Sequence, residues 1–192
     1  MRRTYEQVSL EDVWDHYELT RDSLVRRKES IKQNLLTGRG STEPRFLGMS
    51  LDDIDEFFNN ELNEIDHRTC LFLIAAAEAV LVVDFLNRVG GRKKDTISKN
   101  FRNIFKNECE KNPKNVRLDK HILDIWRDRD GKTKSLIGDF PGALNYRNWL
   151  AHGRHWTPKL GQYYDPLGTA NIVIQLFKEI GLHIPSIKAN PN

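Results

Sequence analysis

The chain has few cysteines, and their placement gives no sign of a disulfide framework or a metal centre. Only two occur among 192 residues, Cys70 in an apolar segment and Cys109 in a charged one. No zinc-type cluster of cysteines surrounds either of them. This pattern excludes a disulfide-rich secreted domain and favours a reducing compartment. We therefore expect no metal and no cofactor.

The chain also lacks a long apolar run that is free of charge. Its longest mainly apolar run, residues 71–86, contains two charged residues, Glu78 and Asp84. It is also shorter than the roughly 20 residues that cross a bilayer. The run therefore predicts a buried core helix. The first residues lead into a charged segment rather than an apolar one, which excludes a secretory signal. We expect a cytoplasmic protein with no membrane partner.

No segment shows the alternation of apolar and polar residues that is typical of a β-strand, and no repeat is found. Apolar residues recur at helical spacing instead, which predicts an all-α fold. Ser9 with Asp12 and Ser50 with Asp53 are capping signals that predict two helix starts. The expected helices cover residues 9–36, 51–61 continuing into 62–89, 96 to the proline at 113, 118–129, 141–153 and 169–180, with a polar loop over residues 130–138.

Residues 1–50 are expected to form an N-terminal helix-and-loop extension, and residues 51–192 the main helical domain. At 192 residues, 39% of them hydrophobic, the chain is long enough to bury a sizeable core. The sequence leaves open whether the extension is separate or belongs to the same domain.

The net charge of +3 conceals two oppositely charged segments. Residues 41–87 contain two Lys/Arg and ten Asp/Glu, so 2 − 10 = −8, whereas residues 88–134 contain 15 and seven, so 15 − 7 = +8. A basic segment attracts a nucleic-acid backbone without regard to sequence and in a salt-sensitive way. The candidate contacts are Arg92, Lys93, Lys94, Lys99, Arg102 and Lys106. The alternative is a solvated helix face, or one that pairs with the acidic segment.

The most informative segment is Asn145–Gly153, which combines a guanidinium, a carboxamide and an imidazole in one apolar helical stretch. Arg147 supplies a permanent, forked positive charge suited to a phosphate. His152 has a side chain that exchanges protons near neutral pH. Asn148 precedes His152 by four residues and so lies on the same helical face. These three candidate catalytic residues can together bind and cleave a phosphodiester.

The arrangement of Arg147, Asn148 and His152 near the end of a late helix resembles the HEPN superfamily, whose signature is an arginine followed after four to six residues by a histidine. The resemblance is close only over residues 140–156, and looser over the hairpin with the earlier apolar helix. It implies a HEPN-like helical bundle and a metal-independent RNA endonuclease, acting as a toxin or in antiviral defence. The partners implied are RNA, a second copy that completes a composite active site, and an antitoxin or regulatory protein.

One geometric feature bears on that composite site. Five positions turn a regular helix by about 500°, so Arg147 and His152 lie about 140° apart and about 7.5 Å apart along the axis. Three explanations stay open: the arginine stem bends round, the helix is distorted near its end, or a two-fold related protomer completes the cleft. The third agrees with the family resemblance and is the basis for expecting a homodimer.

Residues around the motif are assigned supporting roles. Glu78 is expected to be a buried carboxylate with Arg147 as its partner, similar to the polar residue that HEPN domains often carry on the helix facing the motif. Arg154 and His155 directly follow the motif and are assigned as supporting residues. The residues assigned to substrate binding are Lys159, Trp156, Tyr163 and Tyr164, because aromatic rings stack on unpaired bases. The alternative is that these aromatic residues anchor the loop to the domain.

The motif predicts cleavage by attack of the ribose 2′-hydroxyl, with His152 as general base or general acid and Arg147 stabilising the phosphorane-like transition state. Asn148 would orient the histidine or the phosphate. DNA, which lacks the attacking hydroxyl, should resist cleavage. In the alternatives, His152 caps a helix end and Arg147 forms an ordinary ion pair. The chain would then be a non-catalytic HEPN-like module binding RNA, a nucleotide or a protein, or a purely structural helical domain.

Overall fold

The computed structural model describes residues 8–39, 43–109, 116–129 and 131–187. Every regular element within these residues is helical, which confirms the all-α prediction. The proline at 113, expected to end a helix, lies outside the described residues. The elements in chain order are α1 (Leu10–Leu36), η1 (Pro44–Phe46), α2 (Leu51–Gly90), α3 (Thr96–Ile104), η2 (Phe105–Cys109), η4 (Leu118–Leu123), α4 (Asp124–Arg127), α5 (Gly131–Ala151) and α6 (Pro166–Ile180).

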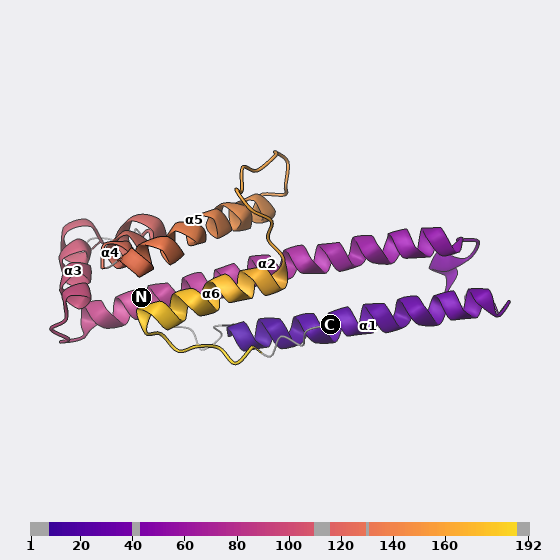
Figure 1. Ribbon diagram of the computed structural model, residues 1–192, viewed down its shortest axis with the longest axis horizontal. Helices are drawn as coiled ribbons and strands as arrows, with labels where there is room; N and C mark the ends of the chain where they lie inside the picture. The colour runs from indigo at the N-terminus through magenta and orange to yellow at the C-terminus, as the bar shows by residue number, and fades with distance from the viewer. Residues whose placement is uncertain (1–7, 40–42, 110–115, 130, 188–192) are drawn as a thin grey trace.

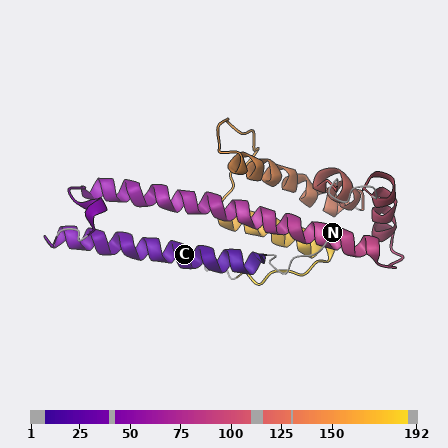
Figure 2. The ribbon, with the colours of Figure 1, turned by 180° about the vertical axis from the view of Figure 1, so that it is seen from behind.

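Helices α1 and α2 form a long antiparallel hairpin (Figure 1). Each starts with a capping box, in which the Ser9 or Ser50 hydroxyl accepts the backbone N–H of Asp12 or Asp53 and the aspartate carboxylate accepts a bond in return. Both predicted starts are therefore confirmed. Helix α2 is continuous over 40 residues, or about 60 Å. The end of the hairpin that carries η1 extends beyond the other helices (Figures 1 and 2).

The main hydrophobic core surrounds the C-terminal half of α2. The first turns of α1 contribute Leu10, Val13 and Trp14 to it, together with buried residues of α3, α4, α5 and α6. A separate small cluster, consisting of Ile31, Phe46, Ile54 and Phe58, closes the far end of the hairpin. The beginning of α1 is thus part of the main core, while the hairpin end has its own packing.

Helix α5 begins earlier than the sequence indicated. The expected polar loop over residues 130–138 is wrong, because α5 starts at Gly131 and Pro141 lies inside the helix rather than in its first turn. Residue 130 itself lies outside the described part of the chain. Ile137 and Phe140 are fully buried in the main core. Their burial offsets the backbone hydrogen bond that a proline cannot make.

Helix α6 runs alongside α2 and packs against both α2 and α5 (Figure 1). Asp165 caps its start by accepting the Gly168 N–H at 2.7 Å, so the helix begins three residues before the expected Thr169. The Thr169 hydroxyl lies 3.4 Å from the Cys70 sulfur of α2. Burial raises the pKa of the Cys70 thiol to about 12, so this cysteine is an inert core residue.

Helix α2 contains a stretch that is long and apolar enough to cross a bilayer, judged by length and composition alone. Only 44% of that stretch is buried inside the molecule. The core helix of a folded domain satisfies the same criterion, but the incomplete burial leaves part of an apolar helix surface uncovered.

Candidate functional site

The motif segment lies at the C-terminal end of α5 and in the turn that follows. The backbone N–H of His152 donates to the Asn148 carbonyl at 3.0 Å, continuing the helix by one bond beyond Ala151. Gly153 then adopts a φ of +80°, as expected for a helix stop. Arg154 adopts a φ of +56°, which is unfavourable for a residue with a side chain. Its guanidinium pairs with Glu64 of α2 at 2.8 Å, which fixes this turn against the hairpin.

Arg147 is held by two partners. Its guanidinium forms an ion pair with Glu78 of α2 and donates to the Asn148 side-chain oxygen at 2.8 Å. The side chains of Arg147 and Glu78 are 25% and 31% exposed, so the expected contact is present but is partly rather than fully buried. The Arg147 Nε is buried and has no hydrogen-bond partner within the described part of the chain. The Arg147 guanidinium therefore binds one carboxylate, and its Nε–H donor stays unused.

His152 lies on the outside of the molecule. Its side chain is exposed, and its carbonyl accepts a hydrogen bond from Nδ1 of His155 at 3.0 Å. The ring of Trp156 lies 4.6 Å from that of His155 and 6.4 Å from that of His152. The Trp156 carbonyl accepts the Trp149 indole N–H at 2.6 Å, which anchors the turn to α5. Two imidazoles and one indole are thereby gathered on one exposed turn.

Among the described residues, Asn148 connects Arg147 to His152. The Asn148 side chain holds the guanidinium, and its backbone carbonyl accepts the His152 N–H. Arg147 points to α2, and no hydrogen bond joins its side chain to the imidazole among the described residues. The arginine stem therefore does not bend round to the histidine, and α5 is helical through Ala151. Within one chain, the described contacts hold Arg147 toward α2 and leave the His152 side chain exposed.

The four residues assigned to substrate binding fall into two groups. Trp156, Tyr163 and Lys159 are exposed on the segment after α5, with Tyr163 at 80% exposure. Tyr164 differs, because it is buried and its ring stacks on Tyr146 at 5.0 Å. A side chain on Gly142 would collide with the Tyr164 hydroxyl, so the ring fits closely against α5. The ring of Tyr164 thus anchors the segment to the core and is not accessible to a base.

His67 of α2 contacts the motif helix, and the sequence did not lead us to expect this contact. Its Nδ1 lies 2.7 Å from the Tyr146 hydroxyl, and its Nε2 lies 3.4 Å from the Asn63 side-chain nitrogen. Its ring also contacts Trp149 edge-on at 6.1 Å. Burial, and then the positive charge of Arg154, lower the pKa of His67. The signal was available in the sequence, because residues 63, 67, 70 and 74 recur at helical spacing on one side of α2.

The basic segment is only partly available to a polyanion. Arg102 donates to the backbone carbonyl of Arg88 in the last turn of α2, at 3.3 Å, and to those of Gly91 and Lys93 just after it, at 3.2 and 2.7 Å. It therefore caps the C-terminal end of α2. Its guanidinium is occupied by these carbonyls and is not one of the groups available to a nucleic-acid backbone. The lysines and arginine that remain exposed are Arg92, Lys93, Lys94, Lys99 and Lys106. Helix α3 lies at the end of the bundle where α5 begins, whereas the motif lies at the opposite end of α5 (Figure 1).

Within the described residues, no group of three or more His, Cys, Asp or Glu side chains is placed to hold a metal ion. Comparisons of this chain with protein-family models, curated proteins and solved structures find no match. A function for the site therefore has to follow from its residues and geometry.

Proposed function

We propose that this chain is a metal-independent endoribonuclease of the HEPN type, with Arg147, Asn148 and His152 as its catalytic residues. The main support is that the Arg147 guanidinium binds the Glu78 carboxylate and the side chain of Asn148. Asn148 lies one helical turn before the exposed His152. A phosphodiester offers acceptor oxygens comparable to those of a carboxylate. A fork that holds Glu78 is therefore suited to a phosphate once that carboxylate is displaced.

The chemistry follows from these groups. His152 removes the proton from a ribose 2′-hydroxyl, the 2′-oxygen forms a bond to phosphorus, and the bond to the 5′-oxygen breaks. Arg147 stabilises the negative charge that develops on the phosphate oxygens. A second imidazole returns a proton to the leaving 5′-oxygen. The products are a 2′,3′-cyclic phosphate and a 5′-hydroxyl, so DNA is not a substrate by this route.

The second imidazole is the reason for including a homodimer in the proposal. Within one chain the Arg147 fork faces α2 and is not hydrogen-bonded to the His152 side chain. A two-fold related copy supplies the missing group and brings both motifs to one cleft. His155 and Arg154 would support the cleft, and Lys159, Trp156 and Tyr163 would contact RNA. The same proposal includes a cytoplasmic toxin or antiviral role with an antitoxin or regulatory partner.

A non-catalytic binding module is the second candidate, and one observation favours it. Glu78 already neutralises Arg147, and the guanidinium points to α2 rather than to His152. Such a site can bind a phosphate by exchanging one anion for another without any proton transfer. In that case RNA, a nucleotide or an acidic protein segment would be the ligand.

The test is cleavage of labelled single-stranded RNA in excess chelator by wild type, Arg147→Ala and His152→Ala. Each substitution should reduce the cleavage rate by about 100-fold or more, because it removes a proton-transfer or charge-stabilising group. Matched controls are Arg27→Ala, which removes an ion-paired arginine near the far end of the hairpin, and His183→Ala, which removes an exposed histidine after α6. Both controls should cut as wild type does.

The outcomes separate the two candidates. Wild-type protein that cuts no RNA, or variants that cut as well as wild type, would show that the catalytic assignment is wrong. RNA binding without turnover that Arg147→Ala weakens and His152→Ala leaves unchanged would establish the binding module. Detection of the cyclic phosphate end distinguishes cleavage by this route from contamination by a metal-dependent nuclease.

A further inference from the structure

The end of the bundle that carries α3 presents positive charge that the described chain does not neutralise. We call this surface the basic patch; its exposed members lie on the linker after α2, on α3 and on η2, and are Arg92, Lys93, Lys94, Lys99 and Lys106. Within the described residues, none of the five forms an ion pair. Residues 88–108 contain seven Lys/Arg and two Asp/Glu, so their net charge is 7 − 2 = +5. Cations concentrated in this way attract a polyanion.

Both acidic residues of this segment already have partners. Asp95 caps α3 by accepting the backbone N–H and the hydroxyl of Ser98, at 2.9 and 2.7 Å, and lies 3.5 Å from the guanidinium of Arg88. Glu108 pairs with Lys120 at 2.6 Å. Neither carboxylate therefore neutralises the basic patch.

The acidic segment, residues 41–87, does not neutralise it either. Eight of its ten carboxylates lie at or before residue 66, and about 35 Å of α2 separates that residue from the end of the helix. Figure 1 shows α3 at the end of α2 that is remote from these residues. Such a separation exceeds the Debye length of about 8 Å in physiological salt. The other two carboxylates, Glu78 and Asp84, pair with Arg147 and Arg88.

Arg102 orders the linker that carries three of the five cations. Its guanidinium binds the carbonyls of Gly91 and Lys93, at 3.2 and 2.7 Å. The negative ends of these backbone dipoles are thereby directed to Arg102, while the side chains of Lys93 and Lys94 stay exposed. A linker whose backbone is already fixed loses less conformational freedom when it binds a ligand.

The surroundings of the basic patch are polar. Ile97 and Phe101 of α3 are buried, and no large apolar side chain is exposed among the described residues between Phe72 and Trp156. An amphipathic membrane-binding helix adds apolar residues that enter the bilayer, and recognition of unpaired bases uses aromatic rings. The basic patch has neither, so the ligand that it fits is a sugar-phosphate backbone.

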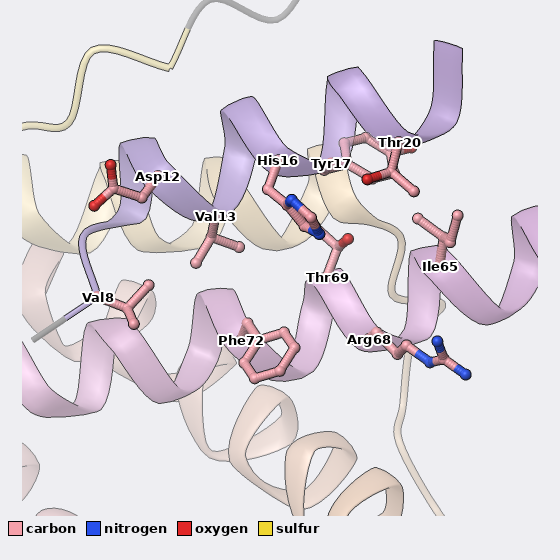
Figure 3. Close-up of a pocket in the computed structure, with 10 residues that line it drawn as sticks. All are labelled: Val8, Asp12, Val13, His16, Tyr17, Thr20, Ile65, Arg68, Thr69 and Phe72. Atoms are coloured by element: carbon pink, nitrogen blue, oxygen red, sulfur yellow. The ribbon is translucent and has the colours of Figure 1, made fainter. Parts of the chain in front are cut away.

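The groove between α1 and α2 has a different character (Figure 3). It has a volume of about 410 Å³, and its lining includes one arginine, Arg68, and one aspartate, Asp12. Arg68 lies 3.4 Å from Glu64. A paired cation beside a carboxylate does not attract a polyanion, so the groove is not an alternative surface for nucleic acid.

We propose that the basic patch binds the sugar-phosphate backbone of nucleic acids, without regard to base sequence and without distinguishing RNA from DNA. The contacts join ammonium and guanidinium groups to phosphate oxygens, which are the same in both polymers. The basic patch lies at the end of the bundle where α5 begins (Figure 1), and α5 has 21 residues before the turn that carries His152. The two surfaces are therefore about 30 Å apart. Binding by the basic patch does not depend on the nuclease function.

One consequence does rest on the proposed nuclease function. An RNA long enough to cover both surfaces gains phosphate contacts that a short RNA lacks. Loss of the basic patch should therefore raise the KM for long RNA and leave kcat unchanged, because the patch touches no reacting atom.

The experiment is fluorescence anisotropy of labelled single-stranded DNA, and of RNA of the same sequence and length, over a range of salt concentrations in excess chelator. The RNA is measured with His152→Ala protein so that it stays intact. Combined substitution of three patch cations, Lys93→Gln, Lys94→Gln and Lys99→Gln, removes three phosphate contacts. The slope of log affinity against log salt concentration should become shallower by about 2, or about 0.7 for each contact, on both probes.

The matched control removes three cations that are ion-paired on the hairpin. It combines Arg27→Gln, Lys32→Gln and Arg68→Gln, whose partners are Glu43, Asp55 and Glu64. The change in net charge is the same, and the slope should stay that of wild type. Arg147→Ala should also bind DNA as wild type does. Circular dichroism verifies that each variant keeps its fold.

Equal slopes for the patch variant and the hairpin control would overturn the proposal, and so would binding of RNA without DNA. Loss of DNA binding in Arg147→Ala would place the contact at the motif instead. Patch-dependent binding to vesicles of phosphatidylserine and phosphatidylcholine, with no binding of either oligonucleotide, would assign the patch to a membrane surface. Patch-dependent DNA binding by a protein that cuts no RNA would uphold the surface and reject only the nuclease function.

Discussion

At the scale of single residues, Asn148 has the central position in the candidate site. Its side chain and its backbone carbonyl contact Arg147 and His152, which lie on different sides of α5. The sequence placed these residues on one helix end correctly, because their spacing is local. It also indicated Glu78 as the partner of Arg147, because a carboxylate within an apolar run needs a compensating charge.

His67 makes a pH-dependent contribution to stability that a titration can measure. Burial and Arg154 hold its pKa below the ordinary value of 6.5, so the unfolded chain binds the proton more readily than the folded chain. The contribution is fully present above pH 6.5 and is lost as the pH falls through the lower folded-state pKa. We expect the Tm of wild type to fall between about pH 7 and about pH 5 more steeply than that of His67→Gln.

Thermal denaturation over this pH range is the measurement, and His183→Gln, which changes an exposed histidine after α6, is the control. The control should keep the wild-type slope, since it leaves the contact between α2 and α5 intact. Parallel curves for wild type and His67→Gln would show that His67 does not contribute to the acid sensitivity.

At the scale of elements, the starts of α1, α2 and α3 were predicted well, and the starts of α5 and α6 were not. Ser9, Ser50 and Asp95 cap their helices through contacts three residues away. The first turns of α5 contain glycines and polar residues, and a proline follows at Pro141. The local sequence of these turns favours a loop. The segment is helical because the helix buries Ile137 and Phe140 in the core.

Substitution of Gly138 tests this assignment directly. Gly138 is exposed inside α5, and an added Cβ would meet no neighbouring atom. Gly138→Ala should therefore raise the free energy of unfolding by about 0.5–1 kcal/mol, as alanine does in a helix interior. Chemical denaturation measures the change. Gly38→Ala is the contrasting variant, because Gly38 has a φ of +71° and the substitution should destabilise the protein. A neutral Gly138→Ala would mean that residues 131–138 do not form a stable helix.

At the scale of the whole molecule, one end of the hairpin belongs to the main core and the other end extends beyond the remaining helices. The first turns of α1 pack into the main core, whereas the far end of the hairpin is closed by the separate cluster around Phe46 and Phe58. The sequence left open whether residues 1–50 belong to the main domain. The packing of Trp14, 5% exposed, ties the described part of α1 to it.

Trp14→Ala should accordingly lower the free energy of unfolding by about 3–5 kcal/mol, because it opens a cavity in the main core. Trp156→Ala provides the comparison, since Trp156 is 42% exposed and its loss should cost much less. Denaturant unfolding followed by circular dichroism gives both values. A small effect of Trp14→Ala would mean that α1 is a dispensable extension of a domain formed by the later helices.

The sequence by itself determined the helical class, the capped starts of α1, α2 and α3 and the order of Arg147, Asn148 and His152, because each depends on neighbours within about one helical turn. Only the tertiary structure decided that Tyr164 is buried, that Arg102 caps α2 and that His67 bonds Tyr146 across 79 positions. It also decided which side of α2 stays uncovered. Such features depend on how the helices pack, and helical periodicity in one segment does not specify its neighbours.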